Sequence, residues 1–162
     1  MNINVLKSVP QIVDHWHDED RSLAACVEQV RQWMREVEQR GIPHFGETAA
    51  RLSPLRERLL QHFEREDKML HQIAELFLTP TPAIDAVRTQ ALHEHDQLLF
   101  ALDELRGRLS RLQPPFVSWQ AAMREVEEFF HSLERHEEQE AVNVQALMVI
   151  RAQHEQHEQP LE

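Results

Sequence analysis

The sequence predicts an all-α protein, folded as an antiparallel four-helix bundle with up-down-up-down order. The composition favours helix, because the 162 residues include only three glycines and no tyrosine, and no β-branched runs mark strands. Apolar residues also recur with helical period in four segments that proline-containing breaks separate. Packing together is the simplest way for four such helices to bury their apolar stripes. A single domain over residues 1–162 is therefore expected, with its core at about 10–150 and a polar tail at 151–162.

The first predicted helix starts near Pro10, because proline suits a first turn, where its missing N–H would have no partner. It ends near Gly41 and Pro43, since glycine commonly follows the last helical residue and proline cannot continue the helix. Its apolar stripe consists of Trp16, Leu23, Val27, Val30 and Met34. Residues 41–53 are expected to form the connection to the next helix, which can include a short helical turn.

The second predicted helix runs from Pro54 to about Leu78. Ser53 followed by Pro54 has the pattern of an N-cap and a proline at the first helical position. The Thr-Pro-Thr-Pro sequence at 79–82 ends this helix, and its second half is a cap-and-proline start for the third.

The third predicted helix continues to about Leu112, where Pro114 and Pro115 stop it. Its stripe consists of Leu92, His95, Leu99, Leu102, Leu105 and Leu109. The fourth helix is expected to begin near Pro115 or Ser118 and to continue toward Ile150. The tail that follows is rich in Gln, Glu and His and is expected to fray.

Composition and charge exclude several functions. The formal net charge of −11 argues against a nucleic-acid or anionic-membrane surface, which would need clustered Lys and Arg. The single cysteine, Cys26, excludes an internal disulfide and a multi-cysteine metal site. No signal-peptide core or long uncharged apolar run is present, so we expect a cytoplasmic protein. No nucleophile constellation, phosphate-binding glycine loop or basic-aromatic patch is visible.

Two His-x-x-x-Glu pairs, His62 with Glu66 and His136 with Glu140, dominate the functional interpretation. Residues four apart project from one face of a helix, so each pair offers an imidazole and a carboxylate to the same space. Such a pair is a suitable half-site for a borderline transition metal. The surrounding apolar residues repeat at a constant offset, which would place the second and fourth helices diagonally across the bundle. Three further pairs share the spacing: His15/Glu19, His71/Glu75 and His154/Glu158.

Helical phase separates the pairs. At about 100° per residue, His62 lies within roughly 60° of Leu59 and Ile73, so it faces the predicted core, whereas His71 lies about 180° from His62. His136 repeats the arrangement of His62 in the fourth helix. His154 belongs to the polar tail. The pairs at 62/66 and 136/140 are therefore expected to be buried.

Each remaining helix offers one further histidine. On the third helix His95 lies in the leucine stripe, while His93 is rotated about 160° away. On the first helix His15 is favoured over His17, because His15 shares its side with Cys26, Trp33 and Val37. Glu19, one turn from His15, is a possible oxygen ligand. The remaining histidines that we assign to the surface are His44, His131 and His157.

Two carboxylates that meet in a bundle core would repel each other unless a cation lay between them. We therefore predict two metal ions bridged by Glu66 and Glu140. The histidines predicted to join the site are His15, His62, His95 and His136. Calcium is disfavoured, because it prefers an all-oxygen site.

This pattern, a single histidine on the first and third helices and His-x-x-x-Glu on the second and fourth, resembles the hemerythrin-like HHE cation-binding domain. The resemblance covers about residues 10–150. It implies two non-haem iron ions, which an oxo group can bridge, with Glu66 and Glu140 between them and the histidines as terminal ligands. It also implies oxygen chemistry.

The sequence departs from the oxygen-carrying hemerythrins in two places. Their third helix carries His-x-x-x-His, but here the residue four positions after His95 is Leu99. Their fourth-helix carboxylate is an aspartate five residues after its histidine, but here it is Glu140, four residues after His136. The pattern is closer to bacterial HHE proteins and to the iron-sensing HHE domain of a ubiquitin-ligase adaptor. Binding or sensing of oxygen or a related small oxidant is therefore expected, and a sensor would need a protein partner or would act by changing shape.

Two alternatives remain open, and a ferritin-like di-iron protein is discounted. One is a di-iron enzyme that acts on peroxide or nitric oxide, and another is a metal-free helical interaction module with an acidic docking surface. A ferritin-like di-iron protein would need Glu-x-x-His on two helices. Only Glu128 and His131 have that spacing, and they lie off the core stripe.

Overall fold

The structure is a computed structural model, and its description covers residues 9–77 and 81–157, with side chains for residues 11, 14, 17, 18, 21–77 and 81–153. Within this part of the chain there are four helices and no strand. The helices are α1 (Val9–Arg40), α2 (Phe45–Glu75), α3 (Pro82–Leu109) and α4 (Trp119–His157). The all-α prediction is confirmed. No helix in the described ranges is long and apolar enough to cross a membrane.

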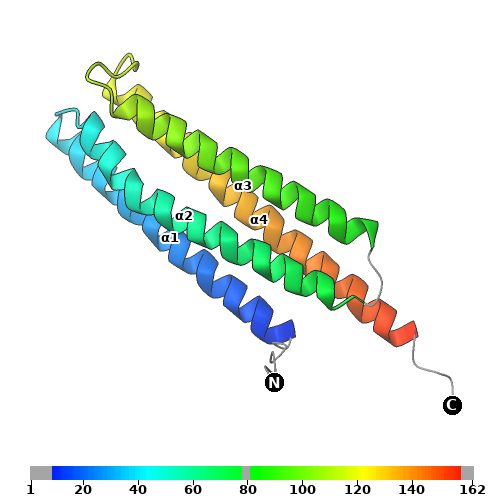
Figure 1. The fold of residues 1–162 in the computed structure, drawn as a ribbon. Helices are drawn as coiled ribbons and strands as arrows, with labels where there is room; N and C mark the ends of the chain where they lie inside the picture. The colour runs from blue at the N-terminus through cyan, green and yellow to red at the C-terminus, as the bar shows by residue number, and fades with distance from the viewer. Residues whose placement is uncertain (1–8, 78–80, 158–162) are drawn as a thin grey trace, which may run out of the picture.

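The four helices lie lengthwise beside one another (Figure 1). The connections from α1 to α2 and from α3 to α4 lie at one end of the molecule, and the start of α1 and the end of α4 lie toward the other. Buried apolar residues form two clusters. The larger draws on all four helices, and the smaller, between the ends of α2, α3 and α4, contains Met69, Leu70, Ile73, Ile84, Ala91, Val144 and Leu147. On α2, α3 and α4 the buried histidines and glutamates lie near the boundary between the residues of the larger cluster and those of the smaller one.

Helix α1 ends as predicted. Gly41 has φ +72°, a left-handed conformation that a residue without Cβ adopts at little cost, and its N–H donates to the Val37 carbonyl at 3.2 Å. The described part of the predicted apolar stripe is buried, and Trp33 and Val37 extend it. The side chain of Trp16 lies outside the described residues.

The predicted start of the second helix is wrong. Helix α2 begins at Phe45, and Pro54 lies inside it, so only residues 42–44 separate α1's glycine from α2. Proline inside a helix removes one backbone hydrogen bond and costs about 3 kcal/mol in an exposed context. Burial of the extra turns offsets that cost, because Thr48, Ala49 and Leu52 are buried on the face that Leu55 continues.

Helix α3 begins where the sequence indicated, with Thr81 as the N-cap and Pro82 in the first turn. It ends at Leu109 rather than Leu112, and Ser110 forms the C-cap. The predicted stripe is partly wrong, because Leu92 is exposed and Leu99 is only half-buried. The buried stripe is Ile84, Ala91, His95, Leu98, Leu102, Leu105 and Leu109. His95 and the leucines C-terminal to Leu99 were assigned correctly.

Helix α4 begins beside Ser118, whose Oγ accepts a hydrogen bond from the Ala121 N–H at 3.1 Å. It continues to His157, seven residues beyond the predicted end at Ile150. The prediction of a fraying tail from Arg151 is therefore wrong for residues 151–157. Five of its seven residues are Arg, Ala, Gln or Glu, which are strong helix formers and favour this extension.

Candidate metal centre

The two His-x-x-x-Glu pairs chosen by helical phase are buried. The side chains of His62 and Glu66 are 2% and 0% exposed, whereas those of His71 and Glu75, on the opposite face of α2, are 59% and 56% exposed. His136 and Glu140 of α4 and His95 of α3 are also buried. Spacing is the same in all of these pairs, so helical phase is the feature that distinguished them.

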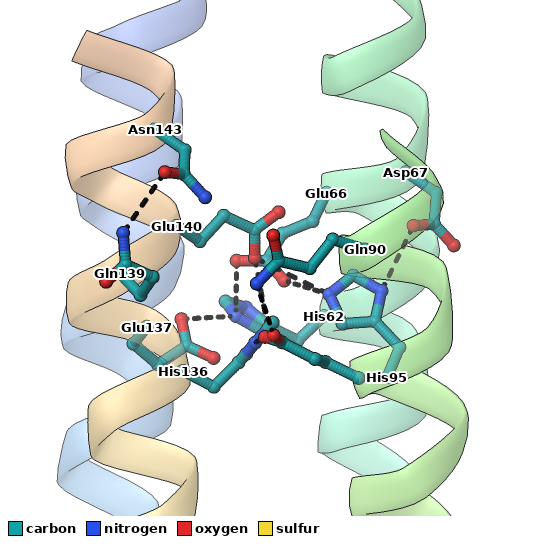
Figure 2. A network of polar contacts seen from close by, with 11 residues as sticks. His62, Glu66, Asp67, Gln90, His95, His136, Glu137, Gln139, Glu140 and Asn143 are labelled. Carbon is teal, nitrogen blue, oxygen red and sulfur yellow. Dashed lines mark hydrogen bonds and ion pairs between the residues drawn. The ribbon is translucent and has the colours of Figure 1, made fainter. Parts of the chain in front are cut away.

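Glu66 lies at the middle of the cluster. Its Oε1 is 2.9 Å from His62 Nε2 on the same helix, and its Oε2 is 3.3 Å from His95 Nε2 on α3. Figure 2 shows these side chains pointing toward one another between α2, α3 and α4. One fully buried carboxylate therefore contacts two imidazoles from different helices through different oxygens.

Glu140 reaches the same space from α4. Its Oε2 is 3.1 Å from His136 Nε2 and 3.5 Å from His95 Nε2. His95 thus lies between the two carboxylates that the sequence analysis singled out. All three histidines present Nε2 to the cluster, which is the orientation that metal ligation through Nε2 requires.

Glu137 is a member of the cluster that sequence analysis missed. Its Oε2 is 3.0 Å from His62 Nε2 (Figure 2), and its side chain is 15% exposed. Helical phase could have pointed to it, because Glu137 follows the buried Leu133 by four residues. Glu137 belongs to no His-x-x-x-Glu pair, because the residue four positions before it is a leucine and not a histidine.

The ligand atoms fall into two overlapping groups. In one group, atoms of Glu66, His95, His136 and Glu140 all lie within 4.8 Å of one another. In the other, the same holds for atoms of His62, Glu66 and Glu137. Glu66 is common to both groups, so the arrangement can hold two adjacent cations that share one carboxylate.

Two further carboxylates contact the Nδ1 atoms of His95 and His136, the ring nitrogens that point away from the cluster. Asp67 Oδ1 lies 3.0 Å from His95 Nδ1, and Glu94 Oε2 lies 2.7 Å from His136 Nδ1. Gln90 donates a hydrogen bond to the other oxygen of Glu94 at 2.8 Å. A carboxylate on the outer nitrogen fixes the tautomer and orientation of a metal-ligating imidazole. Sequence analysis missed Asp67 and Glu94, each of which adjoins a predicted ligand in the sequence.

We expect Asp67→Asn and Glu94→Gln each to weaken metal affinity by about 10- to 100-fold, because the imidazole loses the partner that orients it. Chelator-competition titration measures the change. Asp96→Asn is the matched control, since Asp96 is an exposed carboxylate on the same helix as Glu94. Equal weakening by Asp96→Asn would show that overall charge, not orientation, sets the affinity.

In the metal-free chain the histidines take up protons readily. Burial by itself lowers the pKa of His62, but the Glu137 and Glu66 carboxylates outweigh burial and raise this pKa to about 10. Burial likewise opposes protonation of His95, while Asp67, Glu140 and Glu66 raise its pKa to about 11. The pKa of His136 is also raised, by Glu140 and Glu94 against the effect of burial. Metal binding must therefore displace protons from these rings.

The pKa values of Glu66 and Glu140 are shifted in opposite directions. Burial raises the pKa of Glu66, which is the most deeply enclosed carboxylate. Burial also opposes ionisation of Glu140, but the neighbouring imidazoles of His136 and His95 prevail and lower its pKa to about 2. The histidines therefore favour the ionised form of Glu140, whereas burial disfavours the ionised form of Glu66.

Several buried side-chain atoms of the cluster have no hydrogen-bond partner within the protein. These atoms are His62 Nδ1, both carboxylate oxygens of Glu66, His136 Nε2, Glu137 Oε1 and Glu140 Oε1. Buried polar groups are normally satisfied, and unsatisfied ones are costly. Cations coordinated by these atoms would satisfy most of them. The mixture of imidazole nitrogens and carboxylate oxygens fits iron, manganese or zinc and does not fit calcium.

The α1 ligand stays a prediction. The side chains of His15 and Glu19 lie outside the described residues, whereas His17 is described and exposed. The predicted surface positions of His93 and His131 are confirmed, and His44 is only partly exposed. Glu128 is exposed as well, so the one Glu-x-x-His motif weighed for a ferritin-like site lies off the core. The side chain of His157 is not described.

Comparison with known proteins gives one match. A family model described as the hemerythrin HHE cation binding domain matches residues 11–148, a range that enters all four helices and includes both buried His-x-x-x-Glu pairs. Searches of curated proteins and of solved structures returned no significant match.

Proposed function

The chain belongs to the hemerythrin HHE cation-binding domain family, and from this premise we propose that its buried cluster holds two non-haem iron ions and binds or senses oxygen or a related small oxidant. The observation that carries the proposal is the pair of overlapping ligand groups with Glu66 in common. A shared carboxylate is what two adjacent cations need, because it lowers the repulsion between them.

The residues divide between two positions. His62 and Glu137 would hold one ion, and His95, His136 and Glu140 would hold the other, with Glu66 between them. Glu140, which the sequence analysis also placed as a bridge, belongs only to the group that contains His95 and His136. The irons would supply electrons for reaction with oxygen by cycling between the ferrous and ferric states. His15 of α1 completes the proposed ligand set.

An apolar ring shields the cluster. Phe63 stacks on His95 with ring centroids 4.0 Å apart, and its ring also meets those of His62 and His136, at 5.9 Å and 5.6 Å. Phe63 thereby excludes water from one side of the histidines and restricts their rotation. A small diatomic oxidant fits such surroundings better than an organic substrate, which would need polar groups to orient it.

We also propose that the helices follow the up-down-up-down order and form a single domain. The α1–α2 and α3–α4 connections lie at one end of the molecule and the start of α1 and the end of α4 at the other, which supports this order (Figure 1). In that order α2 and α4 deliver their His-x-x-x-Glu pairs from opposite sides of the bundle.

Metal analysis after expression with iron is the first test. We expect two irons per chain, and a chain that folds fully but takes up neither iron, manganese nor zinc would show that the protein is a metal-free module instead. Zinc uptake alone would indicate a structural site.

Stopped-flow mixing of the reduced, iron-loaded chain with oxygen tests the functional part. Fast oxidation to a stable di-ferric state supports sensing, and a spectral change that reverses on deoxygenation supports carriage. Repeated turnover with peroxide or nitric oxide would contradict the proposal and make the protein an enzyme.

A further inference from the structure

A small cavity of about 210 Å³ opens between α1 and α4 beside the cluster. Its walls are apolar, and its remaining lining consists of three glutamates. The lining residues are Leu23, Ala24, Val27, Leu133, Glu134, Glu137 and Glu138. Helix α1 packs against α4 much less closely than against α2, which leaves room for this opening.

The three glutamates differ in their contacts and in their exposure. Glu134 is held by Arg31, whose Nη1 donates to its Oε1 at 2.5 Å. Glu138 is exposed. Glu137 faces the other way, with Oε2 3.0 Å from His62 Nε2 and a buried Oε1 that has no hydrogen-bond partner. Glu137 therefore links the cavity to the ligand cluster, where the fully buried Glu66 also has unsatisfied oxygens.

The chemistry of the cavity suits a cation. Carboxylates set on apolar, low-dielectric walls concentrate positive ions and repel anions. At about 30 Å³ for each water, the volume has room for about seven waters, so a largely hydrated ion can enter before it exchanges water for protein oxygens. The acidic charge of the whole chain, −11, acts in the same direction.

The second opening toward the cluster differs in shape and charge. The groove between α3 and α4, with a volume of about 430 Å³, includes both Arg135 and Glu94 in its lining and reaches His136 from its outer side. There the Nδ1 of His136 is already occupied by Glu94, which Gln90 also holds. This groove therefore ends on a satisfied hydrogen-bond network rather than on free ligand atoms.

We propose that the cavity between α1 and α4 is the entry path for divalent cations, and that Glu137 is the first carboxylate of the cluster to receive the ion before it reaches His62 and Glu66. This inference rests on the proposed metal-binding function and adds the route and the receiving residue.

Ala24→Phe tests the route, because Ala24 is an exposed lining residue whose enlargement would fill the mouth of the cavity without touching the ligands. Co²⁺ is mixed with the metal-free chain in a stopped-flow spectrophotometer. We expect uptake to slow by about ten-fold or more, because entry then waits for a helix motion, with the final number of bound ions unchanged. Ala101→Phe, at an exposed alanine in the α3–α4 groove, is the matched control and should keep the wild-type rate.

Glu138→Gln tests the charge at the mouth. Uptake should slow about two- to three-fold at low ionic strength and match wild type at high salt, because screening removes steering between exposed charges. Glu128→Gln, an exposed carboxylate in the lining of a second pocket between α3 and α4, is the control and should leave the rate unchanged.

The outcomes separate the two proposals. Slowing by Ala101→Phe but not by Ala24→Phe would move the route to the other groove, and equal rates in all chains would mean that entry needs no preformed path. Either result overturns the inference and leaves the metal site intact. A wild-type chain that binds no cation at equilibrium would overturn the proposed function and this inference with it. Circular dichroism of each variant verifies that it is folded.

Discussion

Glu66→Ala is expected to abolish binding of the metal pair and to remove all of the metal-dependent stability. Glu66 is 0% exposed and is the one carboxylate that belongs to both ligand groups, so its loss affects both positions together. Each ion that binds the native state at 100 times its dissociation constant stabilises the fold by about 2.7 kcal/mol. Two ions would thus contribute about 5 kcal/mol in wild type and almost nothing in the variant.

Thermal melts with and without metal, together with metal analysis, measure this effect. Glu66→Gln accompanies the alanine variant, because it preserves the side-chain volume and should lose the metals without leaving a cavity. Glu75→Ala is the matched control on the exposed face of α2 and should keep both the metals and the metal-induced rise in melting temperature. Equal losses from Glu66→Ala and Glu75→Ala would contradict the assignment.

The second large effect is the pH dependence of the stability of the metal-free chain. His62 and His95 have pKa values raised from 6.5 to about 10 and about 11. A raised pKa means that the folded state binds protons more tightly than the unfolded state, so the stabilisation is complete below about pH 6.5 and is lost as pH rises through the folded-state values. Over pH 6.5 to 10 the loss should be on the order of several kcal/mol.

The stability of the metal-loaded protein should change much less over the same pH range. Ligation needs neutral imidazoles, so the metals bind more tightly as pH rises, and the stability gap between loaded and metal-free chains should widen. Urea denaturation at several pH values measures both curves. His62→Gln should flatten the metal-free curve, and His71→Gln, at an exposed position of the same helix, should not. A metal-free chain with constant stability from pH 6.5 to 10 would show that the histidines carry no extra proton.

Helical phase predicted most of the cluster from the sequence. The burial of His62, Glu66, His136 and Glu140 follows from their period with neighbouring leucines, and His95 was separated from His93 by the same reasoning. Phase within one helix fixes which residues face inward. It does not fix which residues of different helices meet.

The missed residues lie where that limit applies. Glu137 contacts His62 across the bundle, and Asp67 and Glu94 each hold a histidine of another helix. These contacts depend on how neighbouring helices are rotated and shifted, which sequence period does not report. Asp67 and Glu94 are also about one-third exposed, so a search for core positions passes over them.

The predicted start of the second helix was wrong for a different reason. Ser53-Pro54 is a sound local start signal, but burial of Ala49 and Leu52 extends α2 past it, so tertiary packing overrides the local pattern. Thr81-Pro82 has the same pattern and does start α3. The segment before Pro54 contains buried residues of the α2 face, whereas the Thr-Pro-Thr-Pro sequence carries two prolines that a helix cannot accommodate so close together.

Anomalous diffraction from crystals of the iron-loaded protein, recorded on either side of the iron absorption edge, tests the central claim most directly. We expect two peaks about 3.5 to 4 Å apart, as in other two-metal centres, with the Glu66 carboxylate between them. One peak should adjoin His62 and Glu137, and the other should adjoin His95, His136 and Glu140. A single peak, or iron bound only at surface carboxylates away from Glu66, would contradict the two-ion centre.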